Sequence, residues 1–221
     1  MRGAKGKEKG KWYINLQLRM EDERPQTPKG SLGVDLGMSN LAVSSEGQVH
    51  SSEHLQQVRG RYTRLKSELQ SVGTKSAKRK LQKLSGKEKR FRRDVNHGIA
   101  KELVETAKRT QRGLKLEDLK GIRKGAKAKG KSFRKSVHGW SFYQLREFIH
   151  YRCERYGVVL ALVEAKYTSQ TCSCCGHRAK ESRKSQARFE CVQCGYRQHA
   201  DINAAINISR ADVKQPMVGS F

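Results

Sequence analysis

The sequence predicts an α/β fold in which helices pack against a mixed β-sheet, with a small cysteine-rich module inserted late in the chain. The first observation is a set of short apolar segments with the patterns of strands, at 31–36, 41–45, 48–50, 114–119 and 158–163. The second is helical periodicity, which covers most of 53–112 and 140–156. The third is a pair of Cys-x-x-Cys motifs between the last strand and a helical segment at 201–210.

The first 30 residues are expected to lie outside this core. Residues 1–10 are rich in Gly and Lys and are predicted to be disordered. From Trp12 to Leu18, apolar residues alternate with polar neighbours, as they do in a half-buried strand. Two of the chain's three prolines lie in 20–30, which predicts a linker.

The segments between the strands predict how the core is connected. Short turns join the first three strands into a β-meander. The basic helical region is expected to be interrupted near Gly73 and Gly86, because glycine weakens helices. Residues 121–135 are rich in Gly, Lys and Arg, which fits either a lid over a bound strand or a disordered loop. Aromatic residues at helical spacing favour a core face over a base-stacking surface; they are Trp140, Phe142, Phe148 and Tyr151.

The cysteine module contains two matched pairs, Cys172 with Cys175 and Cys191 with Cys194. Four thiolates at this spacing are the ligand set of one tetrahedral zinc ion, and the glycine after each pair permits a left-handed turn. Cys174 lacks a following glycine, so we assign it and the distant Cys153 as free thiols. Two disulfides would require an oxidising compartment, and no segment resembles a signal peptide. A closed four-cysteine site predicts structural zinc.

The charge of the chain predicts a polyanionic partner. Lys and Arg number 47 against 21 Asp and Glu, which gives a formal net charge of +26. Such an excess is typical of proteins that bind DNA or RNA. No apolar run approaches 18 residues and no basic helix has a large apolar face, so a membrane partner is not expected. We therefore expect a cytoplasmic, nucleoid-associated protein.

Basic residues on the helical region and on the module are expected to contact phosphates, which position nucleic acid without reading its sequence. The alternative is a solvated charged face, but the acids that would balance it are too few. The candidates are Arg59, Arg61, Arg64, Lys78, Arg79, Lys83, Arg90, Arg92, Arg93, Arg183 and Arg188.

Three acids lie at informative ends of the predicted elements. Asp35 ends a strand of small apolar residues, Glu117 lies on a short strand, and Asp201 begins the last helix. Each alone has an ordinary explanation, such as an N-cap for Asp201 or turn chemistry for Asp35. Alternation leaves Glu117 and Asp118 as open alternatives, because they point to opposite faces. If three acids converge, they form a site for two divalent cations that hydrolyse phosphodiesters, which predicts a nuclease.

Five motifs resemble, in order and context, the C-terminal half of the TnpB (OrfB) proteins of insertion sequences. They are Gly33-Val-Asp35-Leu-Gly37 with Asn40-Leu-Ala, Leu116-Glu117-Asp118-Leu119, Tyr167-Thr-Ser-Gln-Thr-Cys172-Ser-Cys-Cys175-Gly176, Phe189-Glu-Cys191-Val-Gln-Cys194-Gly195 and Ala200-Asp201-Ile-Asn-Ala-Ala-Ile-Asn. That family is similar to type V CRISPR effectors, and the resemblance spans about 11 to 210. It implies a ribonuclease H-like RuvC nuclease that cleaves DNA under the direction of a guide RNA. It also implies Mg²⁺ as the metal and Asp35, Glu117 and Asp201 as its ligands, which selects Glu117 over Asp118.

The resemblance also implies a division of the chain. Residues 1–30 correspond to a basic tail and the last strand of a truncated β-barrel, 31–166 to the nuclease core, 167–199 to the zinc ribbon, 200–210 to the closing helix and 211–221 to a tail. Family members carry a helical recognition domain and most of that barrel before this point. We therefore expect the guide-handling half to be missing, which fits a fragment, a remnant or a chain that works with another polypeptide.

Two other functions fit the same residues. A nucleic-acid-binding fragment or RNA-guided repressor would bind without cleaving, although the three intact acids argue against it. A transposase that joins DNA strands is not distinguished from a hydrolase by these residues.

Overall fold

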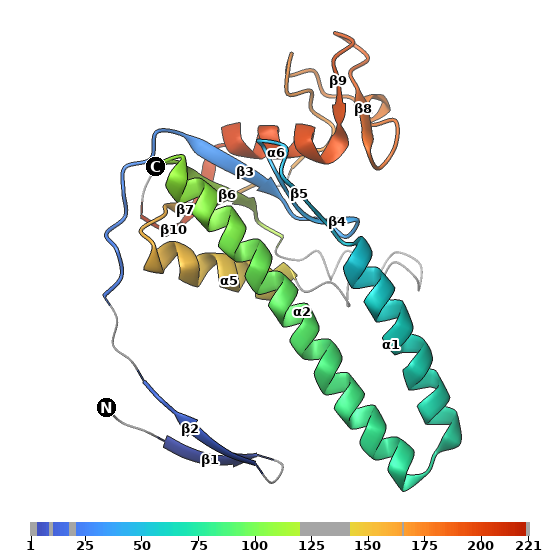
Figure 1. Cartoon of the computed structure of the whole chain (residues 1–221). Coiled ribbons are helices and arrows are strands. Elements are labelled where there is room, and N and C mark those ends of the chain that lie inside the picture. Colours follow the sequence, from blue (N-terminus) through green and yellow to red (C-terminus); the bar gives the residue numbers. More distant parts are fainter. Residues whose placement is uncertain (1–3, 9–10, 18–20, 120–141, 165, 220–221) are drawn as a thin grey trace.

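The computed structural model describes residues 4–8, 11–17, 21–119, 142–164 and 166–219 (Figure 1). Its main element is a six-stranded mixed sheet with the strand order β10-β7-β6-β3-β4-β5. The strands are β3 (Ser31–Asp35), β4 (Asn40–Ser44), β5 (Val49–Ser51), β6 (Gly113–Glu117), β7 (Leu160–Val163) and β10 (Val213–Val218).

The three central strands of this sheet run parallel. β6 lies between β3 and β7 and pairs with both in parallel register, whereas β4, β5 and β10 pair antiparallel. The carboxyl ends of the parallel strands therefore meet at one edge, the usual position of ligand sites in open α/β sheets. Asp35 and Glu117 are the last residues of β3 and β6, so both lie at this edge.

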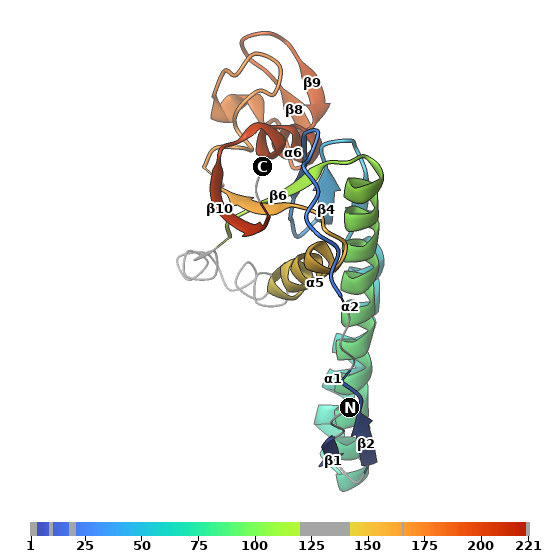
Figure 2. The same cartoon turned by 90° about the vertical axis from the view of Figure 1, so that its left-hand side faces the viewer.

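Helices cover both faces of the sheet. Figures 1 and 2 show α2 (Lys75–Arg109) and α5 (Phe142–Arg155) on one face and α6 (Ala200–Arg210) on the other. The core between the sheet and α2 and α5 is apolar and includes Leu32, Leu103, Leu114, Leu145 and Ile149, each at most 2% exposed. This packing accounts for the apolar faces of α2 and α5 in the sequence.

A long helical hairpin extends from the core. α1 (Glu53–Val72) has no buried residue, and it packs on the N-terminal part of α2 (Figure 1). Gly73 ends α1 with φ +68°, and the Thr74 hydroxyl caps α2 by accepting from the backbone N–H of Ala77. The break predicted at Gly73 is therefore confirmed, whereas the break predicted at Gly86 is wrong. Gly86 lies inside the continuous helix α2, since one glycine costs only about 1 kcal/mol.

Two small sheets accompany the central one. β1 (Ala4–Glu8) pairs antiparallel with β2 (Lys11–Asn15), and β8 (Arg188–Glu190) pairs antiparallel with β9 (Arg197–His199) in the cysteine module. The predicted strands and helices of the core are confirmed within one to three residues at their ends. No described helix is long and apolar enough to cross a membrane.

Four expectations about the periphery are wrong. Residues 4–8 form a strand instead of being disordered, because backbone pairing with β2 needs no apolar side chain. Ile14 and Leu16, in the segment expected to be a half-buried strand, are 74% and 71% exposed. Tyr151 is 38% exposed and is not a core residue. The tail after 210 contains β10, which pairs with the edge of β7. The expected loop at 121–135 and Trp140 lie outside the described residues.

Candidate metal centres

The three predicted acids lie at the edge of the sheet where the parallel strands have their carboxyl ends. We call this group of Asp35, Glu117 and Asp201 the acid site. Asp201 lies in the first turn of α6, which packs against β3. Burial raises the pKa of the Asp35 carboxyl to about 8, and the neighbouring charges of Glu117 and Asp201 add to this effect. Burial also raises the pKa of Glu117. The charges of Glu117 and Asp201 therefore act on Asp35, although among the described residues only the four cysteines have all ligand atoms within 4.8 Å of one another.

Asp201 is held by residues from two other elements. The side-chain amide of Asn40, at the start of β4, donates to Asp201 Oδ2 at 2.9 Å. The guanidinium of Arg183, in the cysteine module, donates to Asp201 Oδ1 at 3.1 Å. The backbone N–H of Asp201 donates to His199 Nδ1, which caps α6. Asp201 is 4% exposed, so these contacts satisfy a buried carboxylate.

Gly33 permits the close approach that brings Asp201 to this edge. A Cβ atom at Gly33 would overlap the carbonyl oxygen of Ala205 and the backbone nitrogen of Ser209. The backbone of α6 therefore lies directly on β3, two residues before Asp35, and no larger residue fits without displacing the helix.

Glu117 and Asp118 have different surroundings in the structure. Glu117 is 8% exposed and accepts from the Thr168 hydroxyl at 2.5 Å, and its charge acts on Asp35. The carboxylate of Asp118 instead accepts from Lys214 Nζ at 2.9 Å, at the start of β10. Strand alternation could not choose between these two residues, and in the folded chain Glu117 is the one near Asp35.

The four predicted cysteines meet in the module. The sulfur atoms of Cys172, Cys175, Cys191 and Cys194 all lie within 4.8 Å of one another. Gly176 and Gly195 have φ angles of +76° and +72°, as the sequence predicted for the turn after each pair. Backbone N–H groups of Cys174 and Cys194 point at Cys172 Sγ and Cys191 Sγ.

This cysteine cluster can hold one metal ion. Soft thiolate ligands in a four-coordinate arrangement favour zinc, and a closed set leaves no position for water. The side chain of Cys174 is exposed and lies outside the cluster, and Cys153 is buried in the core. Both positions agree with their assignment as free thiols.

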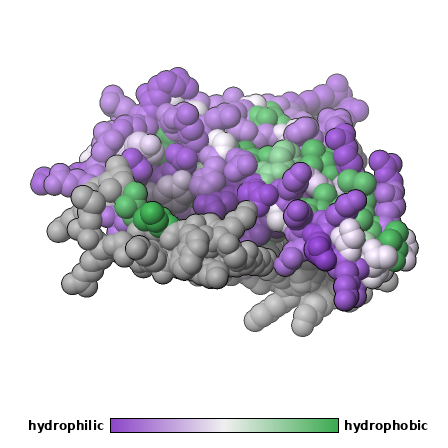
Figure 3. Space-filling model, turned by 60° about the horizontal axis from the view of Figure 1, so that its bottom comes forward, coloured by the Kyte–Doolittle hydropathy of each residue, from purple (hydrophilic) through white to green (hydrophobic). Residues whose placement is uncertain are grey.

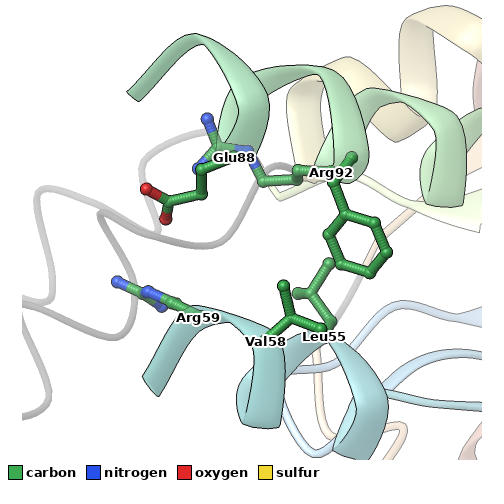
Figure 4. Close-up of a pocket in the computed structure, with 6 residues that line it drawn as sticks. Leu55, Val58, Arg59, Glu88 and Arg92 are labelled. Carbon is green, nitrogen blue, oxygen red and sulfur yellow. The ribbon is translucent and has the colours of Figure 1, made fainter. Parts of the chain in front are cut away.

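The candidate nucleic-acid contacts occupy different environments. Seven are exposed on the α1–α2 hairpin: Arg61, Arg64, Lys78, Arg79, Lys83, Arg90 and Arg93. Arg59 and Arg92 are half-buried and border a small pocket between the two helices (Figure 4). Leu55, Val58 and Phe91 form its apolar part. Arg188 pairs with Glu190 in the module. Figure 3 shows hydrophilic side chains over much of one face of the molecule, with smaller apolar areas among them.

Sequence reasoning missed three residues of the acid site. It did not identify Asn40 or Thr168, and it assigned Arg183 to nucleic acid without placing it against Asp201. Each of the three contacts a carboxylate that is at least 18 positions away in the sequence. The motifs of the family resemblance contain both Asn40 and Thr168, but they gave neither residue a role at the carboxylates.

In the absence of divalent cations, Asp35→Asn is expected to increase the free energy of unfolding. The pKa of this carboxyl rises from 3.8 to about 8 on folding, so ionisation destabilises the folded state. The gain in the free energy of unfolding should be absent below pH 3.8 and constant above about pH 8. Between these two pH values it should grow by up to about 1.4 kcal/mol per pH unit. Denaturant unfolding across this pH range measures it, and a pH-independent difference would contradict the burial of this charge.

Two families of known proteins match this chain. A family described as a probable transposase (OrfB_IS605) matches residues 15–123, and a family described as the Cas12f1-like TNB domain matches residues 142–208. The two matched regions together contain the three acids and the cysteine module.

Curated relatives and solved structures agree with these families. A putative RNA-guided DNA endonuclease, InsQ, of Escherichia coli K12 is 33% identical over 91% of this chain and 54% of its own length. A CRISPR-associated endodeoxyribonuclease Cas12f1 of Syntrophomonas palmitatica is 32% identical over 85% of this chain and 40% of its own length. The chain thus spans about half the length of these relatives. A cryo-EM structure of a CRISPR-Cas12f ternary complex matches the fold with a TM-score of 0.68 and 23% identity, over 96% of this chain and 45% of that chain.

Proposed function

We propose that this chain, which belongs to the TnpB (OrfB) family related to type V CRISPR effectors, forms the metal-dependent nuclease half of an RNA-guided DNA endonuclease. The observation that carries this proposal is the convergence of Asp35, Glu117 and Asp201 at one edge of the sheet. Each acid alone has an ordinary structural explanation, whereas a buried Asp35 whose pKa is raised further by the charges of Glu117 and Asp201 favours a functional site.

A RuvC-type, ribonuclease H-like arrangement fits the sheet. Its three parallel strands carry two of the acids at their ends, and the antiparallel β4 and β5 continue the sheet beyond β3. The helix that carries the third acid crosses β3 at Gly33. This arrangement supports the assignment of the acid edge as the catalytic site.

The ligand set fits divalent cations that prefer oxygen, with Mg²⁺ as the expected ion. Two such cations would activate a water molecule and stabilise the leaving oxygen during phosphodiester hydrolysis. Asp35, Glu117 and Asp201 would hold them, and Asn40 keeps the Asp201 carboxylate oriented toward this edge. Arg183 offsets the charge of Asp201, and it is also the candidate phosphate contact in this region. The cysteine module would bind structural zinc.

DNA and a guide RNA are the proposed partners. One relative is named a putative RNA-guided DNA endonuclease and another a CRISPR-associated endodeoxyribonuclease. The exposed Lys and Arg side chains of the α1–α2 hairpin suit phosphate contacts along a guide–target duplex. Guide binding would also involve the part of the relatives' length that this chain does not span, and the protein would act in the cytoplasm, at the nucleoid.

A metal-dependent cleavage assay tests this proposal. The zinc-loaded chain, its guide RNA and a recognition half supplied in trans are incubated with labelled target DNA and Mg²⁺. The parent should cleave, and Asp35→Ala should not, while its zinc content and affinity for nucleic acid stay close to those of the parent. Cleavage by Asp35→Ala at the parental rate would refute the acid site, and binding without cleavage by the parent would favour the repressor alternative.

A further inference from the structure

The segment 168–173, here called the strap, joins the acid site to the cysteine cluster. Its first residue, Thr168, lies beside Glu117, and it contains the first cluster cysteine, Cys172. Thr168 and Glu117 are each 8% exposed, and the Thr168 hydroxyl donates to Glu117 Oε1 at 2.5 Å. The two residues are 51 positions apart, so tertiary packing alone creates this contact.

One face of α6 holds the strap in place. Asn207 Nδ2 donates to the carbonyl oxygens of Thr168 at 2.8 Å and of Thr171 at 2.7 Å. Asn203 Nδ2 donates to the same Thr171 oxygen at 2.8 Å, and Asn203 Oδ1 accepts from the backbone N–H of Ser173 at 2.9 Å. Arg210 donates to the carbonyl oxygen of Ser173. Asn203, Asn207 and Arg210 recur at helical spacing, so they lie on one side of α6.

This arrangement couples two of the acids. α6 carries Asp201 in its first turn, and the polar face further along the same helix fixes the backbone of Thr168. The hydroxyl of Thr168 then fixes Glu117 on the neighbouring strand β6. A single helix therefore sets the position of Asp201 directly and the position of Glu117 through the strap.

The ordinary alternative is a threonine hydroxyl that only satisfies its own hydrogen bond. Thr110, for example, donates to the backbone carbonyl of Thr106, one helical turn away. Thr168 instead donates to a buried carboxylate oxygen on another element, and it forms a charge-assisted bond when that carboxylate is ionised. Hydrogen bonds of this kind to metal-ligating carboxylates control the orientation of the ligand.

We propose that Thr168 is a positioning residue that orients Glu117 toward the divalent cation, with its own position set by Asn207. This inference rests on the proposed function, because it requires the three acids to bind the cation. It predicts that loss of the hydroxyl weakens cation binding by about 10- to 100-fold, as other outer contacts of metal ligands do.

Binding of Mn²⁺ tests this role without any cleavage assay. Electron paramagnetic resonance is used to measure the Mn²⁺ affinity of the zinc-loaded chain for the parent, Thr168→Val and Thr168→Ala, which both lack the hydroxyl. We expect both variants to bind Mn²⁺ about 10- to 100-fold more weakly while they keep parental zinc content. Thr168→Ser retains a hydroxyl and should recover most of the affinity. Thr110→Val, the matched control, removes a threonine hydroxyl far from the acids and should bind as the parent does.

Asp35→Ala in the same titration separates the two possible failures. If Asp35→Ala binds Mn²⁺ as tightly as the parent, the acid site itself is wrong. If Asp35→Ala loses binding but both Thr168→Val and Thr168→Ala keep parental affinity, the acid site stands and the positioning role of Thr168 is overturned.

Discussion

Replacing Glu117 with alanine should lower the rate of DNA cleavage by about 1,000-fold or more. Stabilisation of developing charge by a bound metal contributes several kcal/mol, and each 1.36 kcal/mol corresponds to a factor of ten in rate. Glu117 is a buried carboxylate whose charge acts on Asp35 at the end of a central strand, so its removal would take away one of the proposed cation ligands. The measurement is a single-turnover rate on labelled target DNA at saturating Mg²⁺.

Asp118→Ala is the matched control for this prediction. Asp118 is the next residue of the chain, but its carboxylate pairs with Lys214 on β10 instead of facing Asp35. Its loss removes the ion pair with Lys214, which is 53% exposed and can be solvated without its partner, so the cleavage rate should stay near that of the parent. An inactive Asp118→Ala together with an active Glu117→Ala would place the site on the opposite side of the strand.

Cys191→Ser should remove the zinc ion and abolish cleavage. Structural zinc sites bind with apparent free energies of about 10 kcal/mol or more, and the loss of one thiolate opens the ligand set. The module also supplies Arg183 to Asp201 and ends at His199, which caps α6, so disorder in the module reaches the acid site. Zinc content measured by atomic absorption should fall from about one ion per chain to near zero.

Cys174→Ser distinguishes loss of the metal from loss of any thiol in this region. Cys174 lies between two cluster cysteines in the sequence, yet its side chain is exposed and outside the cluster. This variant should keep its zinc and its activity. Full zinc occupancy in Cys191→Ser, or zinc loss in Cys174→Ser, would reject the ligand assignment.

The core of the fold could be predicted from the sequence because its elements are locally patterned. β7 is a continuous apolar run, and α5 carries apolar residues at helical spacing. β10 could not be found in this way. Its sequence, VKQPMV, lacks a regular apolar alternation and contains a proline, and it becomes a strand only because the edge of β7 is available for pairing. Gly86 shows the reverse case, in which packing of the hairpin outweighs a local helix-weakening residue.

The candidate site could be predicted where residue types and their spacing alone indicate the chemistry. Four cysteines in two spaced pairs identify their own cluster, and their convergence follows the spacing. The three acids needed a resemblance to a family before Glu117 could be chosen over Asp118, because strand alternation is symmetric between the two faces. Asn40 and Thr168 are ordinary polar residues in the sequence, and only the packing of α6 and the strap brings them to the carboxylates.

The direct packing of α6 on β3 has a consequence for the order of events during synthesis. The ribosome synthesises the chain from its N-terminus, so β3 and β6 emerge well before α6. The hydrogen bond between Asn40 and Asp201 joins residues 161 positions apart, and the surface of β3 at Gly33 stays uncovered until α6 arrives. A nascent chain that ends before Asp201 therefore has only two of the three carboxylates of the proposed cation site. Under the proposed function, cleavage would require that translation has passed the cysteine module and α6, so unfinished chains would not cut DNA.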